Sequence, residues 1–260
     1  MKIVIKIGTS TLTHSTGRTN IRRVADLCRV ISDLKNAGHE IILVSSGAIA
    51  MGVGKLNLST RPSDAPTKQA AAAVGQCELM YIYDRLFAEH NHTVAQLLIT
   101  APDIDDPVRK ENFHNTLERL LAFRVLPIIN ENDTVSTEEL GIGDNDTLSA
   151  TVAASVNADL LVLLSDIDGL YDQDPHINPH ARLIPVVEKL DEHILSLAGG
   201  KGSALGTGGM VTKLRAAQIA GAAGVDMVIA NGQDPLLLYD IAEGRPVGTQ
   251  FLSGKRTCEV

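Results

Sequence analysis

Apolar residues occur along this chain in short, nearly continuous runs instead of alternating with polar ones. The clearest runs are Ile41-Ile42-Leu43-Val44 and Leu160-Leu161-Val162-Leu163-Leu164. Such runs are typical of strands buried on both faces, as in a parallel sheet covered by helices. The pattern therefore predicts buried strands at residues 2–7, 40–45, 93–99, 125–129, 160–165 and 226–230.

Segments of helical character separate these strands, near residues 20–36, 67–89, 108–123, 147–157, 208–223 and 235–243. The repeated β-α-β order predicts an α/β fold: a three-layer αβα sandwich around a mainly parallel open sheet. No low-complexity linker divides the chain, so we expect a single domain over residues 1–260.

Composition narrows the functional classes. The chain has 260 residues, of which 44% are hydrophobic, and this is ample for a buried core. No apolar run approaches the ~20 residues of a membrane-spanning helix, and no signal peptide is evident, so we expect a cytoplasmic protein with no membrane partner. The net charge of −8, the 3% of aromatic residues and the lack of Trp argue against binding of nucleic acid.

A glycine-rich segment with one lysine, residues 206–213, leads directly into a predicted helix. Glycines let backbone N–H groups approach a ligand closely, and a helix N-terminus favours anions. The segment therefore predicts half of a nucleotide site, with a flexible surface loop as the alternative. It does not match a Walker A loop. The G-x-G-x-x-G fingerprint is also missing after the first strand, which disfavours a nicotinamide-dependent dehydrogenase.

Small and polar residues follow the predicted strands, where open α/β sheets bind ligands. Lys6, Ser46, Asp133 and Ser165 all occupy such positions. Lys6 is the strongest candidate, because a lysine within the end of a buried strand requires a partner anion. An internal salt bridge is the alternative to a role in ligand binding.

Two carboxylates and an amide follow one another at Asp144, Asn145 and Asp146, before a helix predicted to begin near Thr147. One of these residues can be explained as the N-cap of that helix, but an N-cap does not account for all three. A pair of carboxylates can bind magnesium, hold lysines in place or bind an ammonium group. The residues alone do not choose among these three roles.

Six motifs resemble those of the amino-acid kinase family, and in particular its glutamate 5-kinase (γ-glutamyl kinase) branch. In chain order they lie at residues 6–10, 44–49, 130–133, 143–150, 165–171 and 206–210 with Lys213. Each is weak evidence alone, but six in the same order over almost the whole chain are specific. The resemblance implies ATP-dependent phosphorylation of the side-chain carboxylate of L-glutamate, giving γ-glutamyl 5-phosphate, the first step of proline biosynthesis.

The resemblance also implies roles for individual residues. Lys6 and Lys213 would contact the ATP phosphates, Asp146 would orient both lysines, and Asp144 would lie close to the same centre. The residues expected to bind L-glutamate are Ser46, Asp133 and Asn145. The residues expected to line the ATP site are Lys6, Gly8, Ser165, Asp166, Thr207, Gly208, Gly209, Met210, Val211, Thr212 and Lys213.

Further expectations follow from the same resemblance. ATP would be used with Mg²⁺, L-proline would act as a feedback inhibitor, and the protein would form a homo-oligomer, either a dimer or a tetramer. An amino-terminal lobe would bind glutamate and a carboxyl-terminal lobe ATP. Many glutamate 5-kinases continue into a C-terminal PUA domain, but this chain ends soon after Phe251, so in departure from that pattern we expect no PUA domain. N-Acetylglutamate kinase is the nearest alternative, but its first loop usually reads Lys-x-Gly-Gly, whereas Thr9 follows Gly8 here. A non-catalytic nucleotide sensor is disfavoured, because Lys6 and Asp146 are both present.

Overall fold

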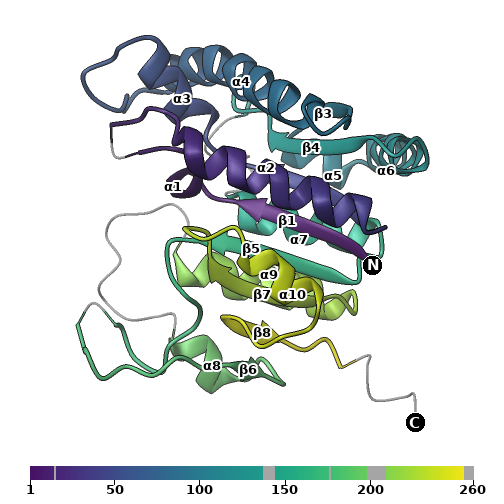
Figure 1. Ribbon diagram of the computed structural model, residues 1–260. Coiled ribbons are helices and arrows are strands. Elements are labelled where there is room, and N and C mark those ends of the chain that lie inside the picture. Colours follow the sequence, from purple (N-terminus) through teal and green to yellow (C-terminus); the bar gives the residue numbers. More distant parts are fainter. Residues whose placement is uncertain (15, 137–143, 176, 198–208, 255–260) are drawn as a thin grey trace.

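The computed structural model describes residues 1–14, 16–136, 144–175, 177–197 and 209–254. Within these residues the centre is an eight-stranded sheet of order β3-β4-β2-β1-β5-β7-β8-β6, which runs from the top to the bottom of Figure 1. The strands are β1 (Lys2–Ile7), β2 (Glu40–Ser45), β3 (Val94–Ile99), β4 (Leu126–Glu131), β5 (Leu160–Ser165), β6 (Val186–Val187), β7 (Asp226–Asn231) and β8 (Thr249–Phe251).

The sheet is mainly parallel, as predicted. The strands from β3 to β7 in the sheet order are parallel to one another, whereas β8 runs antiparallel to β7 and parallel to β6. The six predicted strands agree with β1–β5 and β7 to within two residues. The very short strands β6 and β8 are not predicted.

The helices cover both faces of this sheet. They are α1 (Thr9–Leu12), α2 (Ile21–Asn36), α3 (Ala48–Lys55), α4 (Ala65–Ala88), α5 (Ala101–Asp105), α6 (Pro107–Ala122), α7 (Asn145–Ser155), α8 (Glu192–Leu197), α9 (Met210–Ala222) and α10 (Leu237–Ala242). Of the helices described here, none is both long and apolar enough to span a membrane.

Alternation of side chains along β1 shows how the layers form. Ile3, Ile5 and Ile7 pack into a core shared with α2, α4 and α10, whereas Val4 packs into a second core shared with α6, α7 and α9. The two cores on opposite faces establish the three-layer αβα sandwich. Because successive strand side chains point to opposite faces, Lys6 lies on the face of Val4, beneath α7 and α9.

The chain reverses its direction across the sheet at β1. It passes from β1 to β2 on one side and later returns to β5 on the other side. Open α/β sheets bind ligands at this kind of switch point, beyond the carboxyl ends of the strands. Two backbone hydrogen bonds connect the strand ends there: Ser46 N–H donates to Ile7 O at 3.0 Å, and Gly8 N–H donates to Leu164 O at 3.3 Å.

Candidate active site

A lysine lies buried at the carboxyl end of β1. Lys6 is 9% exposed, and its Nζ lies 2.6 Å from Oδ1 of Asp146 on α7. The pairing satisfies the requirement of a buried ammonium group for an anion. Because Lys6 lies two residues before Gly8, the N-cap of α1, its charge also lies at the edge of the sheet where a ligand would bind.

The same carboxylate contacts a second lysine. Asp146 is 1% exposed, and its Oδ2 accepts hydrogen bonds from Lys213 Nζ at 3.1 Å and Thr212 Oγ1 at 2.8 Å. Lys213 is itself 4% exposed and lies in the first turn of α9. We call Lys6, Asp146, Thr212 and Lys213 the lysine–carboxylate cluster. It joins a strand and two helices that are far apart in the sequence.

Electrostatics keep this carboxylate ionised. Burial alone would raise the pKa of Asp146, but Lys6 and Lys213 stabilise the anion and the net pKa lies below the usual value. One buried negative charge therefore faces two positive ones, and the cluster carries an excess of positive charge. Such an excess suits the phosphate groups of a nucleotide.

Asp144 has a structural role at the start of α7. Its Oδ1 accepts a hydrogen bond from Thr147 N at 2.7 Å, so it is the N-cap and the helix begins at Asn145, two residues before the predicted start. Burial raises the pKa of Asp144, the hydrogen bonds from Thr147 lower it, and the nearby charge of Asp146 raises it, with a net increase. The cap places Asp146 in the first turn, on the inner side of the helix.

Amide side chains form a second group beside this cluster. Asn145 Nδ2 donates to Ser46 Oγ at 2.7 Å and to Asn130 Oδ1 at 3.0 Å. Asn130 Nδ2 in turn donates to Gln76 Oε1 at 3.0 Å. Within the described part of the chain, the buried Oδ1 of Asn145 has no hydrogen-bond partner. We call Ser46, Gln76, Asn130 and Asn145 the amide network, which leaves one acceptor available to a ligand.

Asp133 lies two residues beyond β4, at the same edge of the sheet. Burial raises its pKa to about 6, with Glu131 acting in the same direction and Arg61 in the opposite one. The ionised form of a carboxylate whose pKa is raised by burial is stabilised when a cation binds beside it. Asp133 is therefore suited to an ammonium group.

The predicted ATP-site residues are only partly described. Ser165 Oγ donates to Asp166 Oδ1 at 3.1 Å at the end of β5. A Cβ on Gly8 would lie 3.8 Å from Lys6 Nζ, at ordinary van der Waals distance, so Gly8 lies directly beside the ammonium group. Gly209 is the N-cap of α9, where Met210 follows and Val211 is exposed, whereas Thr207 and Gly208 lie outside the described residues.

The structure adds residues that the motifs did not identify. Asn130 accepts a hydrogen bond from Asn145, and Gln76 accepts one from Asn130, although neither Gln76 nor Asn130 was assigned a role from the sequence. Asn130 lies within a recognised motif and could have been noticed there. Gln76 lies in an alanine-rich helical segment and carries no motif.

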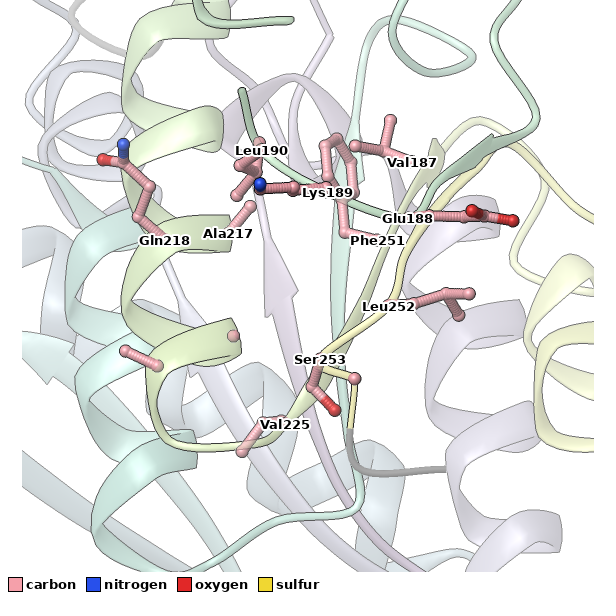
Figure 2. A pocket seen from close by; sticks show the side chains of 13 residues that line it. Val187, Glu188, Lys189, Leu190, Ala217, Gln218, Val225, Phe251, Leu252 and Ser253 are labelled. Atoms are coloured by element: carbon pink, nitrogen blue, oxygen red, sulfur yellow. The ribbon is translucent and has the colours of Figure 1, made fainter. Parts of the chain in front are cut away.

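A pocket lies elsewhere, between β6, the carboxyl-terminal half of α9 and the end of β8, as Figure 2 shows. Its walls are mainly apolar and include Val187, Leu190 and Phe251, with Lys189 extending beside them. Neither the lysine–carboxylate cluster nor the amide network contributes to its lining. We assign it no part in the chemistry of the candidate site.

Relatives of known name match almost the whole chain. The chain is 50% identical over 258 residues to a glutamate 5-kinase of Clostridium perfringens, covering 98% of this chain and 96% of the relative. It is 54% identical over 249 residues to a glutamate 5-kinase of Clostridium tetani, covering 96% of this chain and 93% of the relative. A glutamate 5-kinase of Caldanaerobacter subterraneus is 52% identical over 255 residues, covering 98% of this chain and 68% of the relative.

Solved structures agree on the fold. A carbamate kinase of Giardia lamblia bound to AMP-PNP superposes with a TM-score of 0.65 at 19% identity, covering 96% of this chain and 98% of the other. An isopentenyl phosphate kinase of T. acidophilum gives a TM-score of 0.66 at 17% identity, covering 96% of this chain and 100% of the other. The sequence model of the amino acid kinase family matches residues 1–231. Sequence and architecture agree, and the chain belongs to the amino acid kinase family.

Proposed function

We propose that this chain is a glutamate 5-kinase, which transfers the γ-phosphoryl group of ATP to the side-chain carboxylate of L-glutamate. The reaction, which releases γ-glutamyl 5-phosphate and ADP, is the first step of proline biosynthesis. Relatives that are 50% and 54% identical over nearly the full chain support this assignment. The structural observation that carries it is the burial of Asp146 between Lys6 and Lys213 at the switch point of the sheet.

A carboxylate acceptor explains why this site needs no general base. The side chain of L-glutamate is already ionised near pH 7, so no proton has to be removed before attack. The obstacle is the approach of one anion to another, and the charge that spreads over the transferred phosphoryl group. Positive charges held in fixed positions lower this barrier, and Lys6 and Lys213 are the residues that we assign to it.

Asp146 makes this arrangement possible. Without an anion between them, two ammonium groups would repel each other and move apart. With Asp146 in place, both can face the phosphates at once, and at an effective dielectric of about 20 a charge ~4 Å away contributes roughly 4 kcal/mol. Because the cluster is already assembled, little reorganisation is needed as charge develops.

The amide network and Asp133 would bind the acceptor. The buried Oδ1 of Asn145, which has no partner among the described residues, can accept a hydrogen bond from the substrate, and the Oγ of Ser46, which already accepts from Asn145, keeps a proton to donate. Together with the carboxylate of Asp133, these atoms suit an α-ammonium and an α-carboxylate group. A free amino group would therefore be preferred over an N-acylated one.

Magnesium would arrive with ATP. Among the described residues, no group of three or more His, Cys, Asp or Glu side chains is placed to hold a metal ion. Mg²⁺ in kinases takes most of its ligands from phosphates and water, with one or two carboxylates from the protein. Asp144 would suit that requirement, because among the described residues both lysines pair with Asp146 and leave the carboxylate of Asp144 beside the cluster. The ion would neutralise phosphate charge.

Other properties are proposed from the resemblance to the glutamate 5-kinases. We propose a cytoplasmic homo-oligomer that is inhibited by L-proline, with glutamate bound by the amino-terminal half and ATP by the carboxyl-terminal half. Sedimentation would give the number of subunits. L-Proline added to the activity assay would reveal inhibition.

The proposed function is tested by trapping the acyl phosphate with hydroxylamine in the presence of ATP and Mg²⁺. L-Glutamate, N-acetyl-L-glutamate and L-aspartate are compared as acceptors. Hydroxamate formed with L-glutamate alone is the expected result. Hydroxamate formed only with another acceptor would move the chain to a different activity within its family, and none with any acceptor would contradict an acyl-phosphate kinase.

A further inference from the structure

A polar side chain lies buried in the middle of α4 without any assigned role. Gln76 is 8% exposed and follows Gly75 in a helix whose neighbouring inward residues, such as Leu79, belong to the core. A buried amide lowers stability unless it is hydrogen bonded. The reason for a glutamine at this position must therefore lie in its partners.

The partners of Gln76 lead to the candidate acceptor site. Gln76 Oε1 accepts a hydrogen bond from Asn130 Nδ2 at 3.0 Å, and Gln76 Nε2 donates to Gln96 Oε1 at 3.4 Å. Asn130 is 2% exposed and lies at the end of β4. A helix on one face of the sheet is thus connected to the strand end that precedes Asp133.

The direction of each hydrogen bond fixes the orientation of the next amide. With its Nδ2 directed to Gln76, Asn130 keeps its Oδ1 for Glu131 N at 2.9 Å and Asn145 Nδ2 at 3.0 Å. Asn145 must then present its Nδ2 to Asn130 and to Ser46 Oγ. Both of its N–H groups are used, so its Oδ1 is the atom left for a ligand.

We propose that Gln76 is a positioning residue for the acceptor site, acting through Asn130 and Asn145 to direct the Asn145 Oδ1 towards the α-ammonium group of L-glutamate. The inference rests on the proposed function and extends it to a residue that does not touch the substrate. Without the Gln76 acceptor, Asn130 Nδ2 would be left buried and unpaired. The Asn130 side chain would turn in search of a partner and release Asn145.

The test is Gln76→Met in the full chain, which keeps the length of the side chain but removes the acceptor. We expect the KM for L-glutamate to rise roughly 10-fold, the change that corresponds to one unsatisfied buried donor, with the KM for ATP within about twofold of wild type. Leu79→Ala, one turn further along α4, is the matched control. It should lower the melting temperature and leave the KM for L-glutamate unchanged.

A double-mutant cycle separates positioning from general destabilisation. If Gln76 acts through Asn145, then Gln76→Met should change kcat/KM for L-glutamate less than about twofold in an Asn145→Ala background. If the fold reductions in kcat/KM of the two single variants simply multiply in the double mutant, the two residues act independently and the proposal is overturned. An unchanged KM for L-glutamate in folded Gln76→Met, or equal rises in both KM values, would also overturn it.

A second variant and the activity of the wild-type protein separate the possible causes of a negative result. Gln76→Ala retains a good helix former and adds no bulk, so it replaces Gln76→Met if the latter does not fold, and the same selective rise in KM is expected. Wild-type protein that forms no hydroxamate with L-glutamate would contradict the proposed function. An active wild type with an unaffected Gln76 variant would contradict only the role of Gln76.

Discussion

At the residue scale, the lysine–carboxylate cluster depends on the charge of Asp146 more than on its shape. Asp146→Asn leaves Lys6 and Lys213 buried beside each other without an anion. Removing one partner of a buried ion pair costs about 3–5 kcal/mol, because the remaining charge stays uncompensated. We expect the free energy of unfolding, measured with urea, to fall by about that amount, and hydroxamate formation to become undetectable.

The neighbouring carboxylate provides the control for that variant. Asp144 caps α7, and asparagine is an equally good N-cap. Asp144→Asn should therefore change the free energy of unfolding by less than about 0.5 kcal/mol. A similar loss of stability in both variants would mean that pairing with the lysines is not what makes Asp146 important.

Each lysine can also be removed alone. In Lys6→Ala, Asp146 keeps Lys213 as its partner, so we expect a folded protein whose turnover falls roughly 10²–10³-fold, as for loss of a single electrostatic donor. Lys213→Ala should behave in the same way. Lys55, which pairs with Glu78 on the surface, is the charge-matched control, and Lys55→Ala should keep wild-type turnover. Full activity in either cluster variant would rule out its assigned role.

The raised pKa of Asp133, about 6, predicts a pH-dependent affinity for the acceptor. Only the ionised carboxylate attracts an ammonium group. As the pH falls from 7.5 to 5, the ionised fraction drops to about one-tenth and the KM for L-glutamate should rise roughly 10-fold. The KM for ATP should change much less.

Asp133→Asn checks the origin of this pH dependence. The variant should have a high KM for L-glutamate at every pH, without the steep rise below pH 6. The same substitution should weaken substrate binding but stabilise the folded protein. The folded pKa lies above the unfolded one, so ionisation at neutral pH disfavours the folded state, and Asp133→Asn should unfold at a higher temperature than wild type at pH 7. A KM that still rises below pH 6 in the variant would assign the titration to another group.

The residue scale also shows where sequence reasoning succeeds and fails. Lys6 was identified because a lysine in a buried strand is unusual, and the structure places Asp146 beside it. Gln76 was missed because a glutamine in an alanine-rich helix matches no pattern. Its partner Asn130 is 54 residues away in sequence, and only the packing of α4 against the sheet brings the two together.

At the scale of elements, two glycines determine how closely α3 and α4 approach. A Cβ on Gly75 would overlap the carbonyl oxygen of Ala48, and a Cβ on Gly52 would overlap that of Ala71. Gly75→Ala must push the helices apart near the loop that carries Ser46. We expect a loss of about 1–3 kcal/mol in the free energy of unfolding, the range typical of overpacking.

A glycine in α9 is the matched control for this substitution. A Cβ on Gly221 would have no atom within 4 Å. Gly221→Ala should therefore stabilise the protein by about 0.4–1 kcal/mol through the unfolded state. If Gly75→Ala were equally harmless, the close approach of α3 and α4 would not be a constraint.

The same helix pair explains some differences between the predicted and observed elements. Residues 48–55 were not predicted as a helix, because Gly52 and Gly54 are poor helix formers. The segment forms α3 because it packs closely on α4, and this packing, which requires a glycine at position 52, stabilises the helix despite the low helix propensity of glycine. Similarly, β6 and β8 span two and three residues, too few to produce a recognisable pattern. They form by pairing: β8 pairs with β7, and β6 pairs with β8.

At the scale of the whole molecule, continuous apolar runs were enough to predict a buried parallel sheet. The order of its strands was not predictable in this way, because apolar runs carry no information about which strands are neighbours. That order places β1 between β2 and β5 and so brings Lys6 close to α7 and α9. The candidate site is therefore a property of the topology as much as of its motifs.

This topology predicts that nucleotide binding stabilises the entire chain. ATP with Mg²⁺ would contact groups from β1, β5 and α9 together, and at 100 times its Kd it would add about 2.7 kcal/mol to the stability of the folded state. For a chain of this size, each kcal/mol raises the melting temperature by about 2–4 °C. A rise of roughly 5–10 °C is expected in a thermal-shift measurement, and Lys213→Ala should reduce it. NAD should produce no rise, since the chain lacks the fingerprint of a dinucleotide site. An equal shift with NAD, or an unchanged shift in Lys213→Ala, would mean that the nucleotide binds elsewhere.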